Sequence, residues 1–234
     1  MKQTGRFFII FGLLMILWNT FLIKPIKLFT VFLHELGHAF MAIATGSGIT
    51  ELKIYFNESG HVMSLPKSWW SAFLIANGGY LGSVLFAILI LVLKNTRFRK
   101  YIIGVIAIIF LGFTFRYSGI ASFTMIYSVI FAVFALVLYM IQNDTLNQWV
   151  IEIIGIGSVT YAIYDTLVDT VIMQLNYQFG LFRMGSMPVT DAVSLSRLTH
   201  IPAIVWGLIW VGISIFAVYS VFLKSKGKPS RKRY

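Results

Sequence analysis

Long apolar runs separated by short polar breaks dominate the chain. A membrane-spanning helix needs about 20 predominantly apolar residues. The apolar runs predict helices at residues 7–23, 26–45, 69–93, 101–115, 119–141, 149–175 and 201–223. The fourth run is short, so it forms either a crossing of its own or part of a longer, tilted element. We therefore expect an all-α polytopic membrane protein with six or seven transmembrane helices.

The pattern changes between the second and third helices. Residues 49–56 alternate roughly between apolar and polar side chains, residues 57–60 are typical of a turn, and residues 61–65 can form a returning strand. This predicts a short β-hairpin directly after the second helix. Its edge strand can hold a peptide in extended form through backbone hydrogen bonds. The alternative is a surface connector without a binding role.

Composition agrees with the hydrophobic pattern. Hydrophobic residues make up 58% of the chain and charged residues 12%, which is typical of a membrane protein and excludes an ordinary soluble domain. Cysteine is absent, so any metal site must use histidine and carboxylate ligands. We expect one integral membrane domain over residues 1–223, followed by a basic juxtamembrane tail at residues 224–234.

The formal charge of +11 comes largely from short loops and ends. One basic cluster lies at residues 94–100 and another in the tail. We interpret both as cytoplasmic anchors that contact anionic lipid headgroups, not as nucleic-acid sites. The tail is therefore predicted to be cytoplasmic. Three full crossings before Lys94 would place the N-terminus outside, against the weak preference of Lys2 and Arg6, so this pattern leaves the N-terminal orientation open.

The second predicted helix carries His34-Glu35-Leu36-Gly37-His38 within an apolar run. Positions i and i+4 share a helical face, so both imidazoles can bind one Zn²⁺. Glu35 is then close enough to remove a proton from a water on the metal and return it to a leaving amine. The motif predicts a hydrolytic zinc site within the bilayer.

A hydrolytic zinc site usually has three protein ligands and one open position. Asp165 and Asp169 are candidates for the third ligand, because an ionised side chain inside an apolar helix is costly without a partner. Asp165 is preferred, since it lies nearer the middle of its helix, and Asp169 would then orient a motif histidine. The alternative is that one or both aspartates pair with Arg116 or another buried cation and thereby hold helices together. Asp191 is interpreted as a helix cap.

The chain resembles the site-2 protease-like intramembrane zinc metallopeptidases, in their compact branch without a PDZ domain. The resemblance is carried by five segments: His34 to Phe40 with Thr45-Gly46, Gly79 to Ser83, Tyr164 to Asp169, Thr190-Asp191-Ala192, and Trp206 with Trp210. It implies that His34, His38 and Asp165 bind zinc and that Glu35 is catalytic. The Asp-Gly motif of the larger family members is absent, so the choice between Asp165 and Asp169 stays open.

The resemblance also suggests a role for Asn77, because larger family members use an asparagine near this position to bind the substrate backbone. A helix cap or an interhelical hydrogen bond is the alternative. The glycines at positions 78 and 82 suit close packing of the third helix against the motif helix.

Together these features predict an intramembrane zinc metalloprotease that cleaves membrane-protein or membrane-tethered peptide substrates in the lipid bilayer. Two other functions are considered: a catalytically silent membrane scaffold with a structural metal, and a small ion- or proton-coupled transporter. A structural zinc has no use for Glu35, which argues against the scaffold. The sequence shows no clear pair of interrupted helices, which argues against the transporter.

Overall fold

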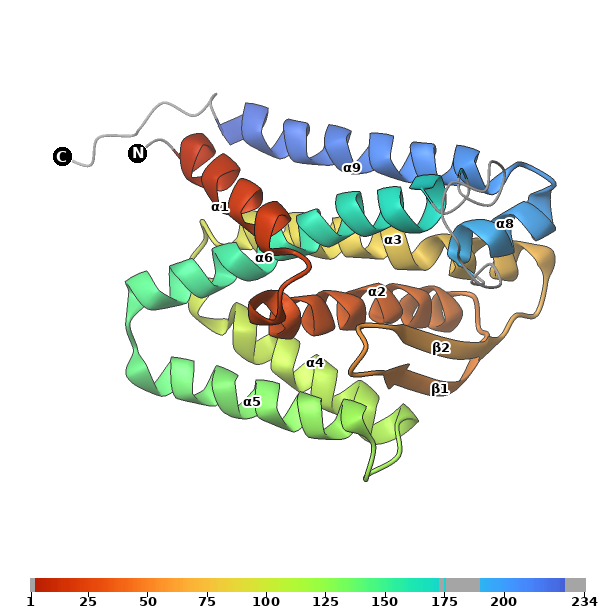
Figure 1. Ribbon diagram of the computed structural model, residues 1–234. Helices are drawn as coiled ribbons and strands as arrows, with labels where there is room; N and C mark the ends of the chain where they lie inside the picture. The colour runs from red at the N-terminus through yellow and green to blue at the C-terminus, as the bar shows by residue number, and fades with distance from the viewer. Residues whose placement is uncertain (1–2, 173–174, 176–189, 226–234) are drawn as a thin grey trace.

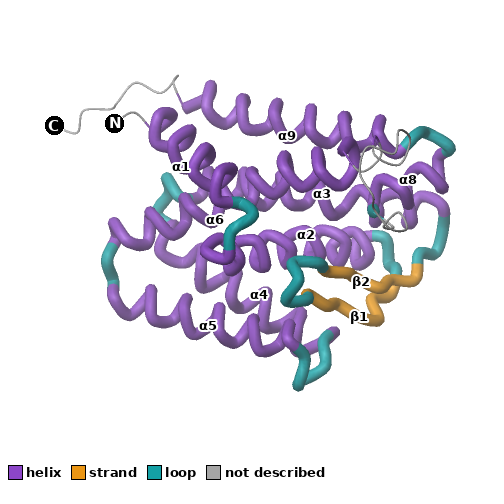
Figure 2. The backbone as a smooth tube through the Cα atoms, in the orientation of Figure 1, coloured by secondary structure: helices purple, strands orange, loops and turns teal. Residues whose placement is uncertain are grey.

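The computed structural model describes residues 3–172, 175 and 190–225. Six of the described helices, extended in places by adjoining turns, are long and apolar enough to cross a membrane, and a two-stranded hairpin follows the motif helix (Figures 1 and 2). The predicted fold class is therefore confirmed. The elements are α1 Gln3–Leu17, α2 Lys24–Ala44, β1 Gly48–Ile54, β2 Gly60–Leu65, α3 Trp69–Leu93, α4 Ile102–Tyr117, α5 Phe123–Ile141, α6 Asp144–Thr166, α8 Asp191–Thr199 and α9 Ala203–Ser225.

The first helix differs from the predicted crossing at residues 7–23. Helix α1 has 15 residues and ends at Leu17, and a short 3₁₀ turn at Phe21–Ile23 leads into α2. Near its N-terminus, Arg6 pairs with Glu152 of α6, and Lys94 at the end of α3 pairs with the same carboxylate. The start of α1 and the end of α3 therefore lie at one end of the bundle, and α1 and α2 together carry the chain to the other end (Figure 1).

Helix α2 lies at the centre of the bundle, between α3, α6 and the hairpin. It meets α3 through glycines at very short range: a Cβ added at Gly37 would lie 2.1 Å from the carbonyl oxygen of Gly78, and one added at Gly82 would lie 2.7 Å from the Cα of Gly37. Only residues without a side chain permit this approach. The predicted close packing of α3 against the motif helix is confirmed.

The hairpin is antiparallel, with Leu52 opposite Val62 and Ile54 opposite Gly60. On the outer edge of β1, the Thr124 hydroxyl accepts from the N–H of Ile54 at 2.9 Å and donates to its carbonyl at 3.1 Å. Antiparallel pairs alternate in the direction of their backbone groups. The N–H and C=O of Gly60 and Val62 therefore point away from β1, along the outer edge of β2.

The tip of the hairpin is held against the start of α2. Glu58, which adopts a positive φ of 70°, pairs with Lys27 and lies 3.8 Å from Lys24. The ammonium of Lys24 also lies 3.6 Å from the ring centroid of Phe56, a cation–π contact. The hairpin is thus fixed along the length of α2, with β2 beside the motif.

Candidate metal centre

The motif histidines lie on the buried face of α2. Their exposed fractions are 6% for His34 and 7% for His38. The Nε2 atoms of the two rings lie 3.1 Å apart, as the i, i+4 spacing on one helix predicts. Helix geometry alone therefore brings two ligand nitrogens together.

A third group comes from α8, far along the chain. The Oδ2 atom of Asp191 lies 3.0 Å from Nε2 of His34 and 3.1 Å from Nε2 of His38. Ligand atoms on a tetrahedral zinc with bonds near 2.05 Å are separated by about 3.3 Å. Within the residues that the structure describes, this is the one group of three potential metal ligands. The three donors fit a zinc ion in both type and spacing.

The charge of Asp191 suits this role. Burial by itself raises the pKa of the Asp191 carboxyl, but the charge of His38 and the hydrogen bonds to both histidines outweigh burial. They hold the pKa of Asp191 well below its usual range, so the group is an anionic oxygen donor.

Each histidine is oriented by a different neighbour. Nδ1 of His38 lies 2.6 Å from the carbonyl oxygen of Ile75 in α3. A carbonyl can only accept, so Nδ1 carries a proton, and Nε2 is the ring nitrogen that would bind a metal. The ring of His34 instead contacts the rings of Tyr80 and Tyr161 edge-on, at centroid distances of 4.7 and 5.6 Å.

Two glycines leave room for the site. A Cβ added at Gly79 of α3 would lie 2.4 Å from Nε2 of both histidines, and one added at Gly60 would lie 2.8 Å from Cγ and Oε1 of Glu35. No other residue type fits at either position without moving these groups. Glu35 is buried, and it lies where the open edge of β2 begins.

Asp165, the preferred third ligand from the sequence, does not join this group. Its Oδ1 accepts a hydrogen bond from Nε1 of Trp18 at 3.1 Å, which links α6 to the fully buried ring at the end of α1. Asp169 lies on the π-helical turn Leu167–Ile172, and its side chain is outside the described residues. The geometry favours Asp191 over Asp165 as the third ligand, and the ligand set itself remains a prediction.

Asp191 does not cap α8, although the sequence suggested a capping role for it. The N-cap of α8 is Thr190, whose hydroxyl accepts from the N–H of Val193 at 3.4 Å. Asp191 is the next residue, so its carboxylate is free of the capping role. The adjacent threonine is the sequence signal that Asp191 need not be the helix cap.

Asn77 has an interhelical partner, as the alternative to substrate binding predicted. Its Nδ2 donates to the carbonyl of Phe73 at 2.9 Å, and its Oδ1 accepts from Nε1 of Trp210 in α9 at 3.0 Å. The ring of Trp210 stacks on Tyr80 at 4.8 Å, and Tyr80 contacts His34. Asn77 therefore supports the packing behind the centre.

Comparison with known proteins places the chain in a family. Comparisons with curated proteins and with solved structures found no match. A protein-family model described as Peptidase M50B-like matches residues 7–221 and thus includes the motif helix, the hairpin and α8. The chain therefore belongs to the Peptidase M50B-like family, the site-2 protease family, and nothing indicates a PDZ domain in it.

Proposed function

We propose that the protein is an intramembrane zinc metalloprotease that hydrolyses peptide bonds within or next to the membrane in membrane-protein substrates. One observation carries this proposal: Nε2 of His34 and Nε2 of His38, both on α2, and Oδ2 of Asp191 on α8 lie within 3.1 Å of one another. Membership of a peptidase family supports the same conclusion.

His34, His38 and Asp191 are the residues that would hold the zinc ion. When bound, zinc supplies a Lewis acid that polarises a carbonyl and makes water more acidic. Glu35 is the base: its carboxylate takes a proton from the attacking water and later delivers it to the amine. A carbon–oxygen bond forms, the peptide carbon–nitrogen bond breaks, and the proton ends on the new amino terminus.

The hairpin gives the substrate a place to bind. A peptide within a transmembrane helix has its backbone bonded internally, so it must unwind before water can attack it. The outward-pointing groups of Gly60 and Val62 can pair with the unwound strand, and Gly60 adjoins Glu35. The β1 edge is already bonded to Thr124, so β2 is the edge available for a substrate.

We also propose that the end of the bundle at which α1 begins and α9 ends faces the cytoplasm. This end of the bundle carries a group of basic residues: Arg6, Lys94, Arg97, Arg99 and Lys100. Helix α9 also ends there (Figure 1). The positive-inside rule favours this orientation. If α1 and α2 together cross the membrane once, the basic residues near the N-terminus and those at residues 94–100 lie on the same side of the membrane, as the positive-inside rule requires.

The orientation is testable because the chain has no cysteine of its own. Single cysteines at Gln142, in the turn before α6, and at Lys67, between β2 and α3, are treated in intact cells with a membrane-impermeant maleimide. We expect Lys67→Cys to react at once and Gln142→Cys only after permeabilisation. The reverse order would overturn the orientation and leave the proposed chemistry intact.

The proteolytic function is tested with the Glu35→Gln variant, which keeps the size of the side chain and removes the base. Membranes from cells that express the parent, Glu35→Gln or the control Glu51→Gln are compared for new protein N-termini within membrane segments. We expect such termini with the parent and the control and none with Glu35→Gln, while zinc content stays equal. The same termini in all three would favour a non-enzymatic protein.

A further inference from the structure

A groove of about 520 Å³ lies between α4 and α5, away from the metal centre. Small residues hollow it: Gly104 and Ala107 on α4 face Ala132 and Ala135 on α5. A Cβ added at Gly104 would have no neighbour within 4 Å, so the space beside it is open. The volume is in the range of small-molecule sites, about 300–1,000 Å³.

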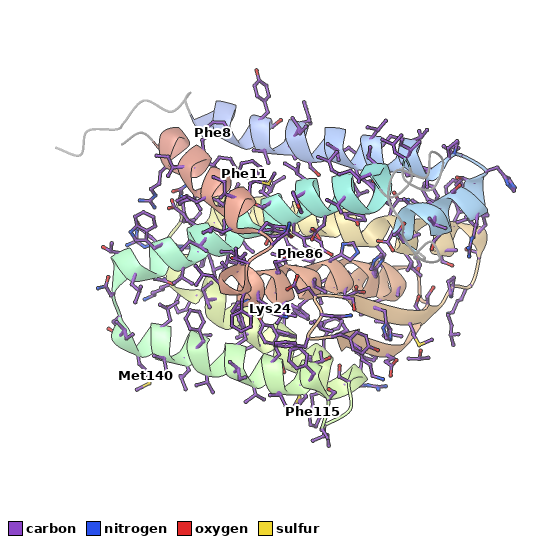
Figure 3. All side chains as sticks on the ribbon, in the orientation of Figure 1. Phe8, Phe11, Lys24, Phe86, Phe115 and Met140 are labelled. Atoms are coloured by element: carbon purple, nitrogen blue, oxygen red, sulfur yellow. The ribbon has the colours of Figure 1, made fainter. Side chains whose placement is uncertain are left out.

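The groove faces the lipid side of the bundle. Helices α4 and α5 form an outer layer of the bundle (Figures 1 and 2). In the most apolar 18-residue stretch of each of these helices, 28% of the residues are buried, compared with 72% in the corresponding stretch of residues 21–44, which include α2. Phe115 and Met140 point outward from this layer at its opposite ends (Figure 3), with exposed fractions of 72% and 70%. The groove therefore opens on an outer face of the bundle, where acyl chains would lie in a bilayer.

One end of the groove is polar and positively charged. Lys100, Gln142, Asn143 and Asp144 line it there, close to the basic turn between α3 and α4. The carboxylate of Asp144 is already paired with Arg99. The exposed ammonium of Lys100 interacts with Tyr101, whose ring centroid lies 4.9 Å away, and its positive charge is available to an anion in the groove.

We propose that this groove binds one anionic phospholipid. An acyl chain lies along the apolar seam between Gly104 and Leu111, and the headgroup phosphate lies at Lys100, where the polar amides of the α5–α6 turn can donate to it. The position of Lys100 at the head of an apolar groove matches the layout of such a lipid. Arg97, outside the groove, adds to the positive potential.

The proposal is tested with two variants and two matched controls. Gly104→Leu fills the groove and Lys100→Gln removes its cation. Gly112→Leu makes the same change on α4 outside the groove, at another glycine with no neighbour within 4 Å, and Arg97→Gln removes one charge outside the groove. The purified proteins are placed in detergent with phosphatidylglycerol or phosphatidylcholine, and bound lipid is counted by native mass spectrometry.

We expect one retained phosphatidylglycerol per chain in the parent and in both controls, and at least a tenfold lower occupancy in Gly104→Leu and Lys100→Gln. Equal retention of phosphatidylcholine in the parent would overturn the preference for an anionic headgroup. Equal losses in Lys100→Gln and Arg97→Gln would indicate general surface attraction instead of a site. Should Gly104→Leu fail to fold, Lys100→Gln against Arg97→Gln still decides the question.

Discussion

Asp191→Asn should weaken zinc binding, whereas Asp165→Asn should leave zinc binding unchanged. The Asp191 carboxylate contacts both ring nitrogens at 3.0 and 3.1 Å, so an amide there removes the anionic ligand. Structural zinc sites with four ligands bind with about 10–16 kcal/mol, or about 3 kcal/mol per ligand. Loss of one ligand therefore predicts roughly a 100-fold or greater decrease in zinc affinity.

Asp165→Asn should behave as a packing variant. The amide oxygen can still accept from Nε1 of Trp18, so only the charge assistance to this hydrogen bond is lost. We expect a loss of about 1 kcal/mol in the free energy of unfolding and no change in zinc affinity.

Both variants are assayed in the same way. Zinc affinity is measured by competition with a chromophoric chelator at fixed pH, and stability by thermal unfolding of the metal-free protein in detergent. The expected pattern is weak zinc binding with Asp191→Asn and normal zinc binding with Asp165→Asn. If Asp165→Asn instead loses zinc and Asp191→Asn retains it, the ligand assignment from the geometry is refuted and the assignment from the sequence is restored.

Three further substitutions test the packing of the centre and of the bundle. Gly79→Ala should abolish zinc binding, because its Cβ would lie 2.4 Å from both Nε2 atoms; normal zinc content would contradict the geometry. Gly37→Ala should force α2 and α3 apart and lower the free energy of unfolding by about 1–3 kcal/mol, measured by thermal unfolding, whereas Gly112→Ala should not. Glu152→Gln should destabilise the protein by about 3 kcal/mol, since two cations lose their shared carboxylate; an unchanged melting temperature would argue against that cluster.

Local sequence determined much of this protein. Hydrophobic run length is sufficient to predict membrane-spanning helices, because the bilayer core has a fixed thickness. The i, i+4 spacing brings His34 and His38 together on any α-helix, so two of the three candidate ligands could be predicted from a five-residue motif. The hairpin was also readable, since its strands are joined by a short turn whose residues are typical of turns.

Only the tertiary structure decided the rest, because the deciding contacts join distant parts of the chain. Asp191 lies 157 residues after His34, and no local pattern tells which of several polar residues packing will place beside the motif histidines. The cost of burying Asp165 was real, but the indole N–H of Trp18, 147 residues away, compensates for part of it. The position of the start of α1 beside the end of α3 depends likewise on Glu152, whose carboxylate pairs with Arg6 and Lys94 at one end of the bundle.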